Sequence, residues 1–104
     1  MAELDKIIHE RARLRILTYL AASDKDKIPF NELQDKLDLS SGNLSIQLKK
    51  LKQARYITID KSFKDNKPFT TVALTPTGSE ALSAYIDEME RLIGDLKNSK
   101  GERG

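Results

Sequence analysis

A polar, basic stretch between Leu39 and Ile59 carries the side chains best suited to recognise another molecule. Leu44, Leu48 and Leu51 follow the i, i+4, i+7 spacing of one helical face, which can anchor a helix to a core. The opposite face holds polar and cationic residues with one aliphatic among them: Gly42, Asn43, Ser45, Ile46, Lys49 and Lys50. Such groups match base edges, phosphates and a thymine methyl. The stretch therefore suits a DNA major groove, although an amphipathic helix with solvated lysines has the same pattern.

The start of this predicted helix is also suited to an anion. Ser40 is a good N-terminal cap, and the backbone N–H groups that follow a cap point outward. We therefore expect Ser41 and Gly42 to lie where a phosphate can dock.

The distribution of charge favours the same partner. The whole chain has a net charge of only +2. From Leu39 to Pro68, however, seven basic side chains face only two acidic ones, so this segment carries a surplus of five positive charges. The rest of the chain is net acidic. A basic face on an acidic body is typical of a protein that binds nucleic acid.

Composition argues against several other classes. There is no cysteine, which excludes disulfides and thiolate metal sites, and the single histidine, His9, stands in a charged stretch without clustered ligands. We expect no metal, no cofactor and a structural role for His9. No nucleophile, base and orienting group converge in the sequence, so we do not expect an enzyme. No apolar run is long enough for a membrane, and we expect a cytoplasmic protein.

Two further helices must hold the polar helix in place. Ala2–Ala22 lacks Gly and Pro and is rich in helix-forming residues, so we predict one helix there. A second helix is predicted over Phe30–Leu37, with Asn31 as its cap. Only Asp38 and Leu39 separate it from the next cap, which requires a tight turn between two helices. This is the helix-turn-helix arrangement.

Two strands and a last helix complete the predicted order. Apolar residues alternate with polar ones after Arg55 and again over Phe69–Leu74, which predicts two strands. Lys64–Pro68 would form the hairpin tip, with Asp65 or Asn66 in the positive-φ conformation of a tight turn. A helix should then begin at Pro76, after Thr75 as its cap.

The last predicted helix carries a coiled-coil-like seam. Leu82, Met89 and Leu96 repeat every seven residues, with Tyr85, Ile86, Leu92 and Ile93 between them. The first predicted helix has a separate short stripe of Leu4, Ile7 and Ile8. Both stripes need a covering surface, and a second copy of the chain would supply one. The alternative is that the last helix packs on its own domain. We expect a disordered tail over residues 98–104.

The order of elements and several motifs resemble a known family. These motifs are IHERARLRIL, PFNELQDKLDLSSGNLSIQLKKL, RYITIDKSF and PFTTVALTPTG. Together they are similar to the winged-helix transcriptional regulators of the MarR/ArsR type, in particular to small stand-alone winged-helix proteins that dimerise through their terminal helices. The resemblance implies that the groove-reading residues are Ser41, Gly42, Asn43, Ser45, Ile46 and Lys49, and that the wing residues are Lys64, Asn66 and Lys67. Relatives commonly have Gly after the groove-reading helix, where this chain has Arg55, which must accept any left-handed conformation there.

Taken together, the sequence predicts an α+β, mostly helical winged helix-turn-helix with dimerisation helices at both ends. Residues 1–97 would form one domain, with its core at 10–75 and dimerisation helices at 1–9 and 76–97. The expected function is a homodimeric regulator that binds specific double-stranded DNA, with or without a small apolar effector between the terminal helices. The alternative is a winged helix that serves only as a protein-interaction module, which explains the core and the seam but not the basic segment.

Overall fold

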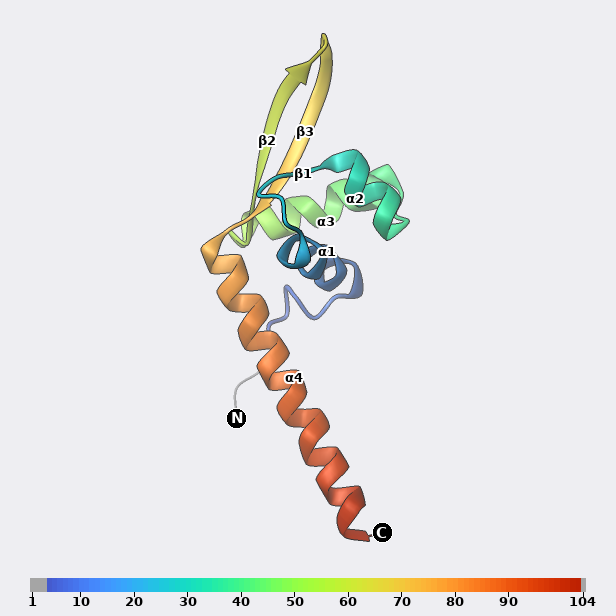
Figure 1. The fold of residues 1–104 in the computed structure, drawn as a ribbon, viewed down its shortest axis with the longest axis vertical. Helices are drawn as coiled ribbons and strands as arrows, with labels where there is room; N and C mark the ends of the chain where they lie inside the picture. The colour runs from blue at the N-terminus through green and yellow to red at the C-terminus, as the bar shows by residue number, and fades with distance from the viewer. Residues whose placement is uncertain (1–3, 104) are drawn as a thin grey trace.

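Four helices and three strands make up the part of the chain that the computed structural model describes, which is residues 4–103, with side chains as far as Asn98. In chain order they are α1 (Arg11–Ala22), β1 (Ile28–Pro29), α2 (Phe30–Leu37), α3 (Ser41–Gln53), β2 (Ile57–Lys64), β3 (Lys67–Leu74) and α4 (Pro76–Arg103). Helices α1 to α3 gather beside the base of the β2–β3 hairpin, while α4 runs away in the opposite direction (Figure 1). The molecule is consequently elongated, at 63 × 25 × 24 Å.

The first helix is shorter than predicted. The carboxylate of Glu10 caps α1 by accepting hydrogen bonds from the first free amides of the helix, at 3.1 Å each. In the segment before α1, the carboxylate of Asp5 accepts hydrogen bonds from the backbone N–H groups of Ile7 and Ile8, at 2.8 and 3.2 Å. These side chains replace helical hydrogen bonds with local turns. The prediction of a single helix over Ala2–Ala22 is therefore wrong for residues 4–10, and residues 2 and 3 lie outside the described range.

The helix-turn-helix has the predicted geometry except at one cap. Helix α2 ends with Asp38 at a φ of 53°, and the Oγ of Ser40 accepts the N–H of Asn43 at 3.1 Å to begin α3. The prediction that Asn31 caps α2 is wrong. The helix already begins at Phe30, so the cap position falls on Pro29, the last residue of β1, whose side chain makes no capping hydrogen bond.

The hairpin is tighter than predicted. Strands β2 and β3 pair along their whole length, and only Asp65 and Asn66 connect them. Both have positive φ values, 54° and 64°, as a two-residue hairpin turn requires. The predicted tip of Lys64–Pro68 is therefore too long, because Lys64 and Lys67 already pair with each other. On its other side β3 pairs with β1, which gives the sheet order β1-β3-β2.

The core confirms the leucine stripe of α3. Leu44 and Leu51 are fully buried, and Leu48 is 2% exposed. They pack with residues from α1, α2 and the sheet: Ile16, Leu17, Leu20, Ile28, Leu33, Leu37, Ile57 and Val72. One side of α3 is thus fixed by apolar burial, and its other side is left for solvent.

The start of α4 is locked onto the junction between α3 and β2. Thr75 caps α4 as predicted, because its Oγ1 accepts the N–H of Gly78 at 2.9 Å. The same hydroxyl donates to the carbonyl of Arg55 at 2.7 Å. A Cβ on Gly78 would lie 2.1 Å from the carbonyl oxygen of Tyr56, so only glycine fits. Backbone contact therefore fixes where α4 leaves the body.

The far end of α4 is longer than predicted. The helix continues to Arg103, so the predicted end at residue 97 and the disordered tail predicted over 98–104 are wrong as far as residue 103, and residue 104 lies outside the described range. No proline follows Pro76, and the residues beyond Gly94 include several good helix formers. Within residues 4–103, no helix is both long and apolar enough to cross a membrane.

The N-terminal segment 4–10 lies against the core and α4. Ile8 is fully buried within the single chain, and Leu82 and Tyr85 of α4 are 4% and 6% exposed. The Nδ1 of His9 is 2.8 Å from the hydroxyl of Tyr85, which joins the two elements. For Ile8, Leu82 and Tyr85, the prediction that a second copy must cover them is wrong, because the chain covers them itself.

Candidate nucleic-acid interface

The outer face of α3 is open over its full length. Burial of the leucines leaves all the predicted contact residues of this helix facing solvent. The exposed residues are Ser41, Gly42, Asn43, Ser45, Ile46, Lys49 and Lys50. Ile46 is 55% exposed and is the one large apolar side chain among them. The helix therefore presents hydroxyl, amide, ammonium and aliphatic groups side by side, the mixture that base edges and phosphates require.

One side chain of this face is held by a hydrogen-bonded chain. The Oδ1 of Asn43 accepts a hydrogen bond from the Nε2 of Gln47 at 3.0 Å. The Oε1 of Gln47 accepts in turn from Nη1 of Arg13, on α1, at 2.9 Å. Sequence reasoning missed both partners. The i, i+4 spacing of Asn43 and Gln47 was a visible signal, but Arg13 lies 34 residues away from Gln47 and gave none.

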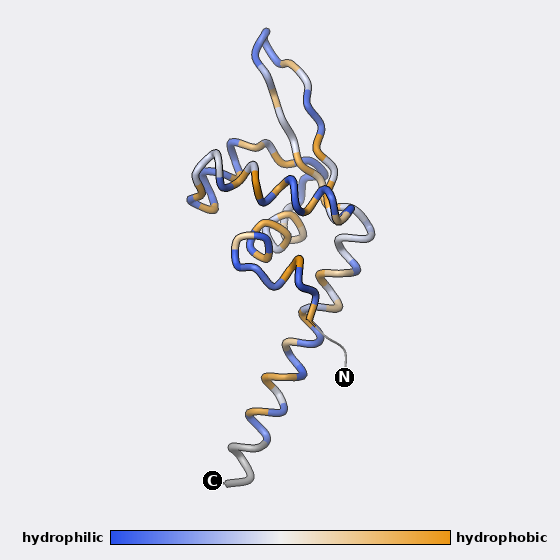
Figure 2. The backbone as a smooth tube through the Cα atoms, turned by 180° about the vertical axis from the view of Figure 1, so that it is seen from behind, coloured by the Kyte–Doolittle hydropathy of each residue, from blue (hydrophilic) through white to orange (hydrophobic). Residues whose placement is uncertain are grey.

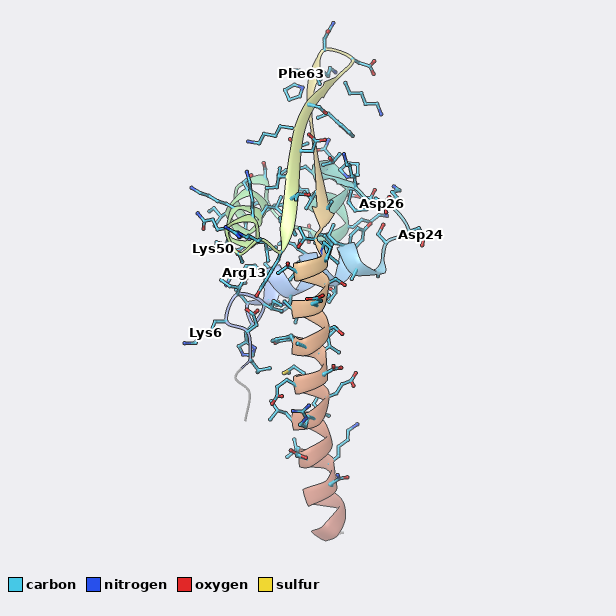
Figure 3. The ribbon with its side chains drawn as sticks, turned by 90° about the vertical axis from the view of Figure 1, so that its left-hand side faces the viewer. Lys6, Arg13, Asp24, Asp26, Lys50 and Phe63 are labelled. Carbon is cyan, nitrogen blue, oxygen red and sulfur yellow. The ribbon has the colours of Figure 1, made fainter. Side chains whose placement is uncertain are left out.

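The basic residues of α3 and the hairpin form no ion pairs. All seven are exposed, and none lies within 4 Å of a carboxylate among the described residues: Lys49, Lys50, Lys52, Arg55, Lys61, Lys64 and Lys67. Asp60 is instead neutralised by Lys27 at 3.3 Å. Lys50 lies on the opposite side of the molecule from Asp24 and Asp26 (Figure 3). The positive charge of α3 and the hairpin is thus not paired with carboxylates of the described residues and is available to an anion.

The wing, defined here as Lys61–Thr70, ends in a pair of like charges. Lys64 and Lys67 occupy the same rung of the hairpin next to the Asp65–Asn66 turn. The ammonium of Lys64 lies 5.2 Å from the centre of the Phe69 ring, which supports it from one side. Directly opposed like charges destabilise a strand pair. A polyanion beside the wing would remove that cost.

Phe63 is a wing residue that sequence reasoning missed. Its side chain is 77% exposed near the far end of the hairpin (Figure 3). It falls on the same face of β2 as Ile57, Ile59 and Lys61, because alternate residues of a strand share a face. The signal was this alternation: Phe63 falls on the same face of β2, four residues beyond Ile59, the last residue of that face to pack against the core.

A hollow of about 660 Å³ separates α3 from the wing. Its rim carries Lys49 and Lys52 of α3 and Lys61 and Thr70 of the hairpin, and Leu48 and Ile59 contribute apolar surface to it. Three lysine residues therefore line the space between the two candidate contact elements. Elsewhere in residues 4–103, no group of three His, Cys, Asp or Glu side chains is arranged to hold a metal ion.

The apolar residues predicted for dimerisation separate into two sets. Leu4, Ile7 and Met89 are half-buried against the core, in addition to the three buried residues described above. The rest are exposed on α4: Ile86, Leu92, Ile93 and Leu96, at 39%, 40%, 47% and 57%. Hydrophobic positions thus continue along α4 beyond the helical body (Figure 2).

Comparison with known proteins gives a consistent result. The family described as the winged helix DNA-binding domain matches residues 12–93. An uncharacterized protein of Methanocaldococcus jannaschii is 33% identical over 92 residues, which are 88% of this chain and 98% of that protein.

Solved structures show the same fold. A transcriptional regulator homologue from Pyrococcus horikoshii OT3 has a TM-score of 0.79 and 29% identity, covering 86% of this chain and 87% of its own. The S. aureus MepR–DNA complex has a TM-score of 0.67, covering 86% of this chain and 64% of its own. Because its identity is 19%, it supports the fold alone.

Proposed function

Because the chain belongs to the winged helix DNA-binding domain family, we propose that it is a homodimeric transcriptional regulator that reads specific duplex DNA. Helix α3 enters the major groove, and the wing lies on the adjacent backbone. The protein acts by binding, without catalysis.

The observation that carries this proposal is the coincidence of two independent surfaces. The face of α3 opposite the leucine stripe is polar and exposed. The seven basic side chains that form no ion pair extend from this helix to the wing. A phosphate backbone beside a groove offers negative charge to these cations, and base edges offer partners for Asn43 and Ser45. A helix with merely solvated lysines gives no reason for the bare charges on the wing.

The exposed stripe of α4 supports the homodimer. Its four residues are 39 to 57% exposed in the single chain. A second copy offers an identical stripe, so a two-fold axis covers both at once. The same axis presents two α3 helices to one side of the duplex, and we expect half-sites about 34 Å apart.

Selection from a randomised duplex pool tests the proposal. The wild-type protein should enrich a two-part sequence and bind it far more tightly than random duplex. The Asn43→Ala variant should lose about 1 to 3 kcal/mol on the selected duplex and much less on random DNA. Gln53→Ala, on the same helix, is the control. If no sequence is enriched and random duplex is not bound, the chain is instead a protein-interaction module.

A further inference from the structure

The hydrogen bonds of Arg13, Gln47 and Asn43 have a fixed direction. A guanidinium group has donors only. The Gln47 oxygen must therefore face Arg13, at 2.9 Å, and its NH₂ group must face Asn43. The oxygen of Asn43 accepts that NH₂ at 3.0 Å. The NH₂ group of Asn43 is left without a partner among the described residues.

Arg13 can set this direction because it is itself fixed. Its side chain is 11% exposed, and its Nε donates to the carbonyl of Ile7 at 2.6 Å. Figure 3 places Arg13 on the same side of the molecule as Lys50 of α3. The chain of hydrogen bonds thus begins at a nearly buried cation and ends in the first turn of α3, on the exposed face.

Resting on the proposed function, we infer that Gln47 and Arg13 are positioning residues that hold the Asn43 amide with its NH₂ group toward DNA. Helix α3 then requires an acceptor at the base that Asn43 meets. In the major groove, purine N7, guanine O6 and thymine O4 are acceptors, whereas cytosine offers the N4 donor. The base at this position is therefore not cytosine. A purine fits best, since it presents its N7 acceptor in the major groove.

Without Gln47 the amide is free to turn over and present its oxygen. Cytosine then becomes an acceptable partner, while contacts to phosphate are unaffected. A purely structural role for Gln47 would predict the opposite, with all duplexes losing affinity together.

The probe is the duplex selected by the wild-type protein, with the base read by Asn43 located from the Asn43→Ala variant. Four versions of this duplex, one for each base at that position, are then bound to the wild type and to Gln47→Met, which has similar length but cannot form either hydrogen bond. We expect discrimination against cytosine to fall about fivefold in Gln47→Met, the factor expected for one neutral hydrogen bond. Gln53→Met, the same change at an exposed position of α3, is the matched control and should leave discrimination unchanged.

A second pair of variants tests Arg13. Arg13→Lys keeps a donor for Gln47 and should retain the discrimination, whereas Arg13→Met should lose it as Gln47→Met does. Far-ultraviolet circular dichroism verifies that each variant is folded, and the Gln47 variants decide the matter if Arg13→Met unfolds. Where the selected base is a purine, replacing it by its 7-deaza analogue should weaken binding of the wild type but not of Asn43→Ala.

The outcomes separate this inference from the function itself. If the wild type selects no sequence, the proposed function fails. If it selects a sequence with cytosine at the Asn43 position, or if Gln47→Met discriminates as the wild type does, only the positioning role of Gln47 is overturned.

Discussion

The hydroxyl of Tyr56 donates a hydrogen bond to the carboxylate of Asp5, across 51 residues of chain. Asp5 also organises the turns before α1, and the carbonyl of Tyr56 receives the backbone of Thr75 at 3.1 Å at the start of α4. One residue at the α3–β2 junction thus joins both terminal segments to the body.

This contact gives the stability a dependence on alkaline pH. Burial of the phenol, and next its hydrogen bond to Asp5, raise the pKa of Tyr56 to about 12. The raised pKa means that the fold favours the protonated phenol, so this contribution is complete below the unfolded value near 10 and is lost between about pH 10 and 12. Urea unfolding in that range should show a steeper loss of stability in the wild type than in Tyr56→Phe. Parallel curves would show that the phenol titrates normally.

Arg55 should be replaceable with a gain in stability. It has a φ of 66°, and the hydrogen bonds around it, from its own N–H to Lys52 and from Tyr56 to Leu51, close α3 in the motif that usually ends in glycine. Arg55→Gly should raise the free energy of unfolding by up to about 1 kcal/mol. The neighbouring Ala54 has a helical φ of −79°, so Ala54→Gly is the control and should lower stability by about 0.5 to 1 kcal/mol.

The wing lysines should act on phosphate and not on sequence. Each phosphate contact contributes about 0.9 to the slope of log affinity against log salt, so changing both Lys64 and Lys67 to Ala should lower the slope by nearly 2 per wing. The ranking of DNA sequences should stay the same. Changing Lys6 and Lys36 to Ala removes equal charge from exposed positions outside α3 and the wing, without breaking an ion pair, and should leave the slope unchanged. An unaltered slope in the wing variant alone would confine binding to α3.

Phe63 should contribute apolar contact to DNA. An exposed ring among lysines is suited to the sugars or base steps of a minor groove next to the wing. Phe63→Ala should weaken binding to the selected duplex while the salt slope stays at its wild-type value, because no charge is removed. A control is available in Ser62, which lies on the other face of the strand and can also be changed to Ala. Equal affinities for the wild type, Phe63→Ala and Ser62→Ala would show that Phe63 makes no contact with DNA.

A charge in the exposed stripe of α4 should prevent dimerisation. Ile93 is 47% exposed and adds nothing to the core of the single chain, so Ile93→Asp should give folded monomers at concentrations where the wild type is dimeric. Asn98→Asp adds the same charge one and a half turns further along, on the opposite side of the helix, and should remain dimeric. Light scattering measures both. A monomeric wild type would exclude the proposed assembly.

The parts of the fold that sequence predicted are those fixed by local patterns. The leucine stripe of α3, the Ser40 cap and the positive φ of Asp65 and Asn66 each depend on residues within a few positions of one another. The predictions that failed concerned features decided by competing local hydrogen bonds or by residues far apart in the sequence. Helix propensity predicted α1 from Ala2, but the Glu10 carboxylate supplies the cap at which the helix begins.

The candidate site shows the same division. The exposed residues of α3 followed from the position of its buried leucines. The contact from Arg13 to Gln47 joins two helices, and no periodicity within either one indicates it. The heptad pattern of α4 was real, but pattern alone does not say which partner covers a stripe. Tyr85 turned out to face the N-terminal segment of its own chain.

The close backbone contact at Gly78 means that α4 and the rest of the fold move as one rigid unit. Since its first turn rests directly on the backbone of Tyr56, the helix cannot pivot independently of the body. Its 28 residues correspond to an arm of about 42 Å. Turning that arm by about five degrees at its far end would displace the body by roughly 4 Å, comparable to the rise of one base step. In the proposed homodimer, a ligand or substitution that alters how two α4 helices cross would thereby shift the spacing of the two α3 helices along DNA.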